Sequence, residues 1–225
     1  MRNAIDEIFN TGITNTLAGN DIINGGNDEI NDFGEYSFVN IYGTLNTDSG
    51  NDRITGIFNQ QNELGNFPFF FPHGITNIAP DPGEGGYATI NTGDGNDTIT
   101  GIFNGANYNS SWGHGIYNVR GIIDTGDGSD IITGIGKIYG IFTEVTTIDT
   151  GNGDDIITGI GGDTGIDSRV NTTINTGDGN DIITATGDGG WGILLLNGTI
   201  DTGEGNDIIN GTGGISGLGS IPVLQ

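Results

Sequence analysis

The chain has no cysteine, two histidines, and five lysine and arginine residues among 225. Without cysteine it can form neither a disulfide nor a thiolate metal site. Against the five basic residues stand 29 acidic ones, which give a net charge of −24. Such a surface repels nucleic acid and anionic membranes and attracts cations, so we expect no nucleic-acid partner.

Long apolar runs are also missing. None approaches the ~20 residues that span a bilayer, so no membrane insertion is predicted. The N-terminal stretch MRNAIDEIFN carries Asp6 and Glu7 and lacks the apolar segment of a signal peptide. Export would therefore use another route, or the sequence is already mature. A helical fold is disfavoured, because Gly-Asp-Gly turns interrupt any apolar period of 3.6 residues.

What is abundant is glycine, with 45 residues, and an internal repeat. The stretch TINTGDGNDTITG (89–101) recurs as IIDTGDGSDIITG (122–134), TIDTGNGDDIITG (147–159), TINTGDGNDIITA (173–185) and TIDTGEGNDIING (199–211), with a weaker copy, TLNTDSGNDRITG (44–56). The last acidic residue of each turn serves as an anchor; the anchors are Asp21, Asp52, Asp97, Asp130, Asp155, Asp181 and Asp207. The last four are 25, 26 and 26 residues apart. Isoleucines at fixed places in each unit argue against disorder.

A second landmark, a small residue followed by an apolar one, precedes most acidic turns; it occurs in GITN (12–15), SFVN (37–40), GITN (74–77), GIYN (115–118), GIFT (140–143), GIDS (165–168) and GILL (192–195). A unit of about 25 residues with short strands between glycine turns is typical of one solenoid coil. We therefore predict an all-β fold: one parallel β-solenoid of about seven coils over residues 1–225. Ile148 and Ile157 should point inward, with Thr and Asn or Asp outside.

Two units are enlarged, with inserts at 59–73, 78–88 and 104–114. They hold the aromatic residues Phe67, Phe69, Phe70, Phe71, Tyr87, Tyr108 and Trp112. Inserts on adjacent coils emerge on one side, so these rings form either a patch for a glycan or a lateral contact, or a satellite core of their own. His73 and His114 occupy matching places in PHGI and GHGI, where a structural role is expected.

Stacking places equivalent aspartates ~4.8 Å apart along the axis. Neighbouring carboxylates would repel by about 1 kcal/mol in water and ~3.5 kcal/mol at an effective dielectric near 20. Protonation would need a raised pKa at every turn, and five basic side chains cannot cover the column. Cations remain, and several Ca²⁺ ions fit best, because calcium takes six to eight oxygen ligands in a forgiving geometry.

The turns GDGNDTIT, GDGNDIIT and EGNDIIN resemble the RTX nonapeptide G-G-x-G-x-D-x-U-x, which builds calcium-dependent parallel β-rolls; LAGNDIINGGNDEI (17–30) is the nearest tandem match. The resemblance implies calcium shared between stacked turns by carboxylates and glycine carbonyls. The implied carboxylates are Asp21, Asp28, Asp52, Asp97, Asp130, Asp155, Asp181 and Asp207, and the implied glycines are Gly95, Gly128, Gly153, Gly179 and Gly205.

The repeat departs from this family in two ways. The usual first glycine is Thr92, Thr125, Thr150, Thr176 or Thr202. Each coil also has one such turn, which predicts a wider, three-sided coil with one calcium column. The second acidic position is either a ligand or a solvated turn residue; it is held by Asp94, Asp127, Asp178 and Glu204.

These observations predict a calcium-stabilised structural protein, which the family resemblance places at a bacterial surface or outside the cell. Ile8–Asn10 resembles the coil half at 54–59 and 99–104, and 213–225 begins a unit without reaching an acidic turn, so we expect complementary ends that stack head to tail. The alternative is a calcium-dependent binding module for ice or polysaccharide, using the column Thr100, Thr133, Thr158 and Thr184. No nucleophile motif is present, and Arg120 or Arg169 would have to serve a lyase-like site, so an enzyme is not predicted.

Overall fold

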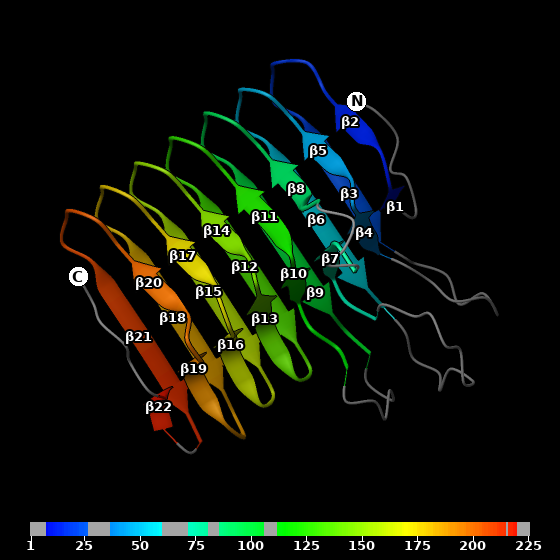
Figure 1. The fold of residues 1–225 in the computed structure, drawn as a ribbon. Helices are drawn as coiled ribbons and strands as arrows, with labels where there is room; N and C mark the ends of the chain where they lie inside the picture. Colours follow the sequence, from blue (N-terminus) through cyan, green and yellow to red (C-terminus); the bar gives the residue numbers. More distant parts are fainter. Residues whose placement is uncertain are drawn as a thin grey trace.

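The computed structural model describes residues 8–26, 37–59, 72–80, 86–105, 112–214 and 216–219. All regular elements in these segments are strands, and they form three parallel sheets. The chain visits sheets A, B and C in turn and then begins the next coil (Figure 1). This confirms the predicted all-β parallel solenoid of about seven coils.

Each sheet gathers one strand from every coil. Sheet A contains β1 (Ile8–Asn10), β4 (Phe38–Ile41), β7 (Ile75–Ile78), β10 (Ile116–Val119), β13 (Tyr139–Glu144), β16 (Thr164–Ser168), β19 (Trp191–Leu195) and β22 (Ser216–Gly219). Sheet B contains β2 (Ile13–Asn15), β5 (Thr44–Asn46), β8 (Ala88–Asn91), β11 (Gly121–Asp124), β14 (Thr147–Asp149), β17 (Thr173–Asn175) and β20 (Thr199–Asp201). Sheet C contains the longer strands β3 (Ile22–Gly26), β6 (Arg53–Phe58), β9 (Thr98–Phe103), β12 (Ile131–Gly136), β15 (Ile156–Gly161), β18 (Ile182–Gly187) and β21 (Ile208–Gly213).

The core is built from one inward apolar side chain per strand. In the central coil these are Ile116 of sheet A, Ile123 of sheet B and Ile132 of sheet C, all fully buried. Parallel pairing in register repeats this triad along the axis, so the isoleucines form three columns. Ile148 and Ile157 lie in these columns with no exposed surface, as predicted.

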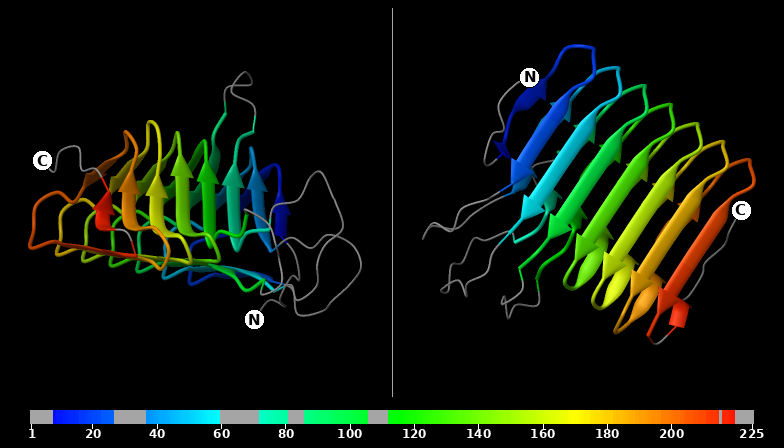
Figure 2. Two further views of the ribbon diagram at one scale, coloured as in Figure 1. Left: turned by 90° about the horizontal axis from the view of Figure 1, so that it is seen from below. Right: turned by 180° about the vertical axis from the view of Figure 1, so that it is seen from behind.

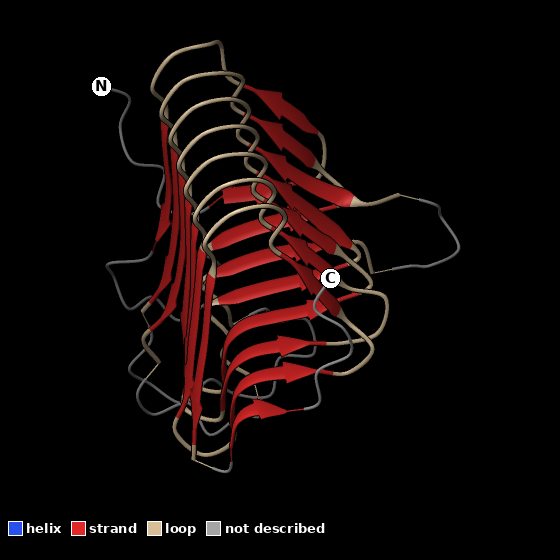
Figure 3. Cartoon of the chain, turned by 90° about the vertical axis from the view of Figure 1, so that its left-hand side faces the viewer, coloured by secondary structure: helices blue, strands red, loops and turns tan. Residues whose placement is uncertain are grey.

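Sheets A and C approach each other so closely that glycine is required between them. A Cβ on Gly134 of β12 would overlap the carbonyl oxygen of Gly140 in the next strand of sheet A. The cross-section therefore narrows on this side, while the acidic turns close the opposite corner as a stack of loops (Figure 3).

The corner between sheets A and B is held by side-chain amides. Asn10 donates to Asn40 Oδ1 at 2.9 Å, Asn40 to Asn77 at 2.8 Å, and Asn77 to Asn118 at 2.9 Å. Asn118 then donates to Thr146 Oγ1 at 2.6 Å, where the amide ladder ends. Because buried amides need partners, this ladder fixes the stacking of the first coils.

One expectation about the ends of the chain is wrong. Ile8–Asn10 does not continue sheet C, as its likeness to residues 54–59 predicted, but pairs with Phe38–Asn40 in sheet A. Since β22 also belongs to sheet A, the two ends are not complementary halves of one coil. The alignment failed because a three-residue strand takes its sheet from its neighbour and not from its own sequence.

Most of the enlarged loops, with Phe67, Phe69, Phe70, Phe71 and Tyr108, lie outside the described residues. Tyr87 and Trp112 are described, and both are about half exposed, at 55% and 51%. Within the described segments no helix has the length and hydropathy needed to cross a bilayer.

Candidate metal centre at the B–C corner

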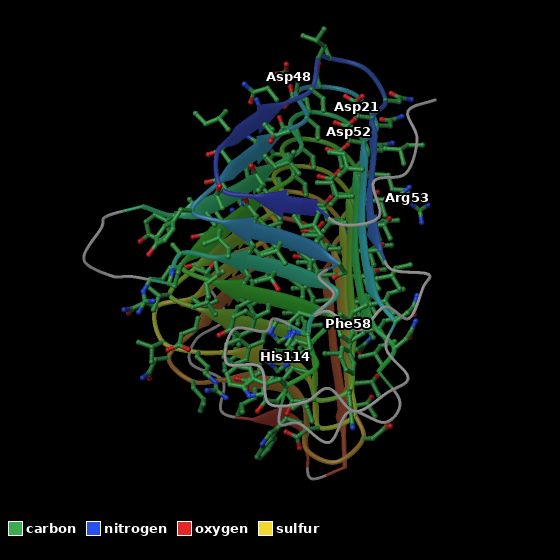
Figure 4. The ribbon with its side chains drawn as sticks, turned by 90° about the vertical axis from the view of Figure 1, so that its right-hand side faces the viewer. Asp21, Asp48, Asp52, Arg53, Phe58 and His114 are labelled. Atoms are coloured by element: carbon green, nitrogen blue, oxygen red, sulfur yellow. The ribbon has the colours of Figure 1, made fainter. Side chains whose placement is uncertain are left out.

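The acidic turns connect sheet B to sheet C and lie one above another. Figure 4 shows Asp21 and Asp52 at this corner, with Arg53 on the outer side of sheet C just beyond it. The turn stack runs parallel to the solenoid axis (Figure 3). One corner of the coil thus gathers the anchor aspartates of all the described turns.

Two turn positions need backbone conformations that side chains disfavour. Gly128 has φ +152°, and a Cβ there would overlap the carbonyl oxygen of Gly95 in the coil before it. Gly126 has φ +75°, a left-handed conformation, and Asp48 takes the same conformation in the weaker repeat with φ 65°. Glycine therefore permits the turns to stack at the strand spacing.

The anchor aspartates point into the molecule. Asp52, Asp97, Asp130, Asp155 and Asp181 are buried, and Asp21 and Asp207 at the two ends of the column are partly exposed. The anchors therefore differ from Asp149 beside Ile148, which faces outward as expected, because the last turn residue is directed toward the core by the strand that follows it.

One carboxylate oxygen of each anchor after Asp21 joins two coils. Asp130 Oδ1 accepts the backbone N–H of Asp97 at 2.7 Å, and Asp155 Oδ1 accepts that of Asp130 at 2.8 Å. The same bond recurs along the whole column, at Asp21–Asp52, Asp52–Asp97, Asp155–Asp181 and Asp181–Asp207. Hydrogen bonds to an ionised acceptor are stronger than neutral ones, so this ladder holds the turns together.

The second oxygen distinguishes two groups of turns. In three of them a threonine hydroxyl donates to Oδ2 at 2.6 Å; the pairs are Thr16–Asp21, Thr150–Asp155 and Thr176–Asp181. Oδ2 of Asp52, Asp97 and Asp130 is buried and has no hydrogen-bond partner. Such an oxygen carries an unmet requirement for a proton or a cation.

The electrostatics of the column agree with this. The pKa of Asp130 is raised to about 7, chiefly by burial; the Thr125 hydroxyl and the Asp97 N–H oppose this shift, and the carboxylates of Asp155 and Asp97 add to it. Thr125 Oγ1 lies near this carboxylate but falls short of hydrogen-bond geometry, whereas the equivalent threonine donates at 2.6 Å in each of the next two coils. Burial also raises the pKa of Asp155, to about 6. A proton and a cation would therefore compete for this column near neutral pH.

The second acidic position lies on the outside of the turn. Asp94, Asp127, Asp178 and Glu204 are exposed. Asp127 Oδ1 accepts the N–H of Asn152 at 3.1 Å, and Asp178 Oδ1 that of Glu204, also at 3.1 Å. These outer carboxylates also join adjacent turns. Asp28 lies outside the described residues.

The turn glycines supply further oxygens. In the described turns no backbone N–H donates to the carbonyls of Gly95, Gly128, Gly153 or Gly179. Each of these carbonyls faces the equivalent glycine of the next coil. A Cβ on Gly179 would overlap the Gly153 oxygen and lie 3.2 Å from Asp181 Oδ1, the oxygen that already accepts the Asp155 N–H, so a turn carbonyl and an anchor carboxylate lie close together.

This all-oxygen donor set fits a hard cation such as Ca²⁺ and not zinc or copper. Carboxylates alone would not hold the ion, because no group of three His, Asp or Glu side chains suited to a metal occurs among the described residues. A calcium ion would take Oδ2 of Asp52, Asp97 or Asp130 together with turn carbonyls. It would neutralise buried charge in the column.

Two features of this corner and its surroundings escaped the sequence analysis. The threonine at the family's first glycine donates to the aspartate five residues later, as in Thr150–Asp155; the T-x-x-x-x-D spacing was the available signal. The asparagine ladder at the A–B corner had a signal too, the fourth letter of SFVN (37–40), GITN (74–77) and GIYN (115–118). GITN (12–15) misleads here, because its asparagine belongs to β2 of sheet B and the ladder residue of the first coil is Asn10.

The two histidines lie elsewhere, on the outer side of sheet A. His73 and His114 are buried and stacked with ring centroids 4.6 Å apart. Their stack continues through Tyr117 and Phe142 to the guanidinium of Arg169, which lies 4.6 Å from the Phe142 ring. Arg169 forms an ion pair with the buried Asp167 at 3.0 Å. Arg120, by contrast, contacts the Ala79 and Pro80 carbonyls at 3.4 Å.

Burial, with the adjacent His114, lowers the pKa of His73 well below its ordinary value. Burial and the Arg169 charge lower that of His114 to about 3. Both rings are therefore neutral at physiological pH, and they pack as aromatic side chains. No family model, curated protein or solved structure matches the chain.

Proposed function

We propose that this protein is a calcium-stabilised structural solenoid that acts outside the cell. The observation that carries the proposal is the run of three buried carboxylate oxygens without a partner, on Asp52, Asp97 and Asp130. They lie on consecutive coils, in a chain whose net charge is −24. A divalent cation shared between these turns would satisfy the oxygens and reduce the repulsion along the corner.

Calcium titration of the chelator-treated protein tests this proposal. An ion that binds only the folded state stabilises it by about 2.7 kcal/mol at a hundred times its dissociation constant. We expect the midpoint of thermal unfolding to rise with calcium and to return on addition of EGTA. Magnesium is the matched control, because its tight octahedron fits the carbonyl-rich turns poorly. A midpoint of thermal unfolding that does not change with calcium up to millimolar concentrations would contradict the proposal.

We also propose that the solenoid assembles along its axis into a filament or matrix. At the N-terminal end the described residues Ile13 and Leu17 are 78% and 87% exposed. The outermost strands β2 and β3 of sheets B and C have no second strand partner among the described residues. An uncovered edge of this kind is a template for pairing with another chain.

Electron microscopy and sedimentation at matched protein concentration, with calcium and with EGTA, test assembly. Rods that lengthen in calcium, where the −24 charge is partly neutralised, would support it. A monomer at every calcium and protein concentration would exclude assembly and leave the calcium proposal standing, because folding and assembly are measured separately.

A further inference from the structure

The outer face of sheet C is an unusually regular surface. Along each strand the first, third and fifth residues point outward, while the second and fourth face the core. This sheet has seven strands, and they lie side by side in Figure 2 (right). The third position forms one column of Asn24, Thr55, Thr100, Thr133, Thr158, Thr184 and Asn210.

Isoleucines flank this column on both sides. The first position holds Ile131, Ile156, Ile182 and Ile208 on consecutive strands, and the fifth holds Ile57, Ile102, Ile135 and Ile160. Several remain exposed: Ile131 at 39%, Ile160 at 42% and Ile208 at 48%. The face thus alternates methyl and hydroxyl groups in a fixed pattern.

Charge is nearly absent from this face. Arg53 is the one charged side chain among the described outward positions of β3, β6, β9, β12, β15, β18 and β21, although the chain has 29 acidic residues. On sheet B the outward residues include Asp124, Asp149 and Asp201. Acidic side chains are therefore missing from the outer face of sheet C but not from the outer face of sheet B.

The face is also rigid and periodic in two directions. Its strands pair in unbroken parallel register from Thr55 through Thr184. Equivalent threonines therefore repeat every ~4.8 Å along the axis, and alternate residues of a strand every ~6.7 Å. A partner that matches such a surface must itself repeat at a few ångströms in two directions.

We propose that the outer face of sheet C binds ice. A water lattice is uncharged, repeats on this scale and can bond to each hydroxyl as donor or acceptor, while the methyl groups fill the spaces between its molecules. A protein partner would be expected to meet aromatic anchors or charges, and a crystalline polysaccharide would need rings on which its sugars stack. The described outward positions contain neither aromatic side chains nor carboxylates.

Thermal hysteresis and the fraction of protein incorporated into a growing ice hemisphere test the proposal. We expect the wild-type protein to arrest the growth of ice crystals and to be incorporated into the ice. Thr158→Tyr places a ring in the middle of the face and should reduce hysteresis about tenfold, because a flat, preorganised contact tolerates no protrusion at its centre. The matched control is Thr147→Tyr, a similarly half-buried outward threonine on sheet B. It should leave hysteresis unchanged.

Circular dichroism and unfolding midpoints establish that both variants fold. Wild-type protein without hysteresis at millimolar concentration would overturn the proposal, as would equal losses in both variants. So would a wild-type dimer that Thr158→Tyr dissociates without any effect on ice, since the face would then join two copies of the chain. The inference does not depend on calcium, because strand pairing and the isoleucine core already define the face.

Discussion

At the residue scale, each anchor aspartate uses its two oxygens differently. Oδ1 of Asp130 joins two coils through the Asp97 N–H, whereas Oδ2 is buried without a partner. Asparagine at position 130 would keep an oxygen that accepts the Asp97 N–H and would remove the negative charge of the carboxylate. The substitution therefore separates the hydrogen bond from the cation requirement.

We predict that Asp130→Asn is more stable than wild type in EGTA at pH 8 and gains less from calcium. The folded-state pKa of Asp130 is raised to about 7 from 3.8, so the folded chain binds the proton more tightly and its stability falls as pH rises through this window. Removing that buried charge should add about 1 kcal/mol or more at pH 8 and nothing below pH 4. Calcium titration by differential scanning calorimetry measures both effects.

The control is Asp127→Asn, which removes an exposed carboxylate from the same turn. It should leave the calcium-free stability nearly unchanged at both pH values. If the two variants respond alike, the effect belongs to net charge and not to the buried column.

A second residue-scale prediction concerns stacking. Gly128→Ala would drive a methyl group into the Gly95 carbonyl at a φ of +152°. We expect a loss of about 3 kcal/mol in the free energy of unfolding, because the nearest atoms that the methyl group would meet are backbone and cannot move aside. Gly12→Ala, with nothing within 4 Å of its Cβ, should change stability by about 0.5 kcal/mol or less. Urea unfolding of the two variants is the measurement, and equal losses would contradict the stacking account.

The sequence could predict where the anchor aspartates lie in the coil but not whether their side chains face the core or solvent. Repeat spacing located Asp97 and Asp130 on one corner, since equivalent residues of a solenoid stack. Whether a turn aspartate faces solvent or core depends on the pleat of the following strand, which begins at the next residue. The burial of the column, and the threonine donors that satisfy part of it, therefore required the structure.

At the element scale, the stack on sheet A is the clearest feature that follows from strand pairing alone. Tyr117 of β10 lies opposite Phe142 of β13, while His114 lies two residues before β10 begins. Their rings come together because adjacent parallel strands bring equivalent outward side chains close. Repeat alignment matched His73 with His114, but it could not indicate that both rings are buried and neutral.

This stack predicts an acid-sensitive contribution to stability. The folded-state pKa of His114 is about 3, whereas a solvated imidazole has 6.5. The unfolded chain thus binds more protons between these values, so stability is full above pH 6.5 and falls as pH is lowered toward 3, by at most ~1.4 kcal/mol per pH unit for each group. The raised pKa values of the buried aspartates increase stability as pH falls, which opposes the effect of His114. The measurement must therefore compare the pH dependence of a variant with that of the wild type.

We expect His114→Phe to gain stability relative to wild type as pH falls from 7 to 4, because phenylalanine keeps the stack with Tyr139 and Phe142 and cannot be protonated. Tyr117→Phe is the control; it alters the same stack without a group that titrates in this range. Guanidinium unfolding at several pH values provides the comparison. A pH-independent difference for His114→Phe would show that the imidazole is not the acid-sensitive group.

At the scale of the whole molecule, the structure is close to one-dimensional, since each coil contacts the coils on either side. The coil length was readable from the 25- and 26-residue spacing, and the isoleucine columns followed from it. The sheet to which β1 belongs was not readable, because three residues carry too little pattern to distinguish sheet A from sheet C. Pairing with Phe38–Asn40 decides that assignment.

This architecture predicts that one complete coil can be removed without loss of the fold. Deleting residues 156–181 joins Asp155 to Ile182, two positions already equivalent to Asp181 and Ile182 in the repeat. Ile148 would then stack on Ile200, and Phe142 on Leu194, in place of their present neighbours. At ~0.05–0.15 kcal/mol per residue, loss of one coil should reduce the free energy of unfolding by about 1–4 kcal/mol.

The matched control deletes residues 156–168, half a coil, which removes β15 and β16 and puts every later strand on the wrong sheet. Far-UV circular dichroism and urea unfolding should show a cooperative β-sheet protein for the full-coil deletion and an unfolded or aggregated chain for the half-coil deletion. If both deletions unfold, the coils depend on contacts beyond their neighbours. If both fold, the order of the three sheets does not constrain the chain, and the register of the aspartate column would no longer follow from the repeat.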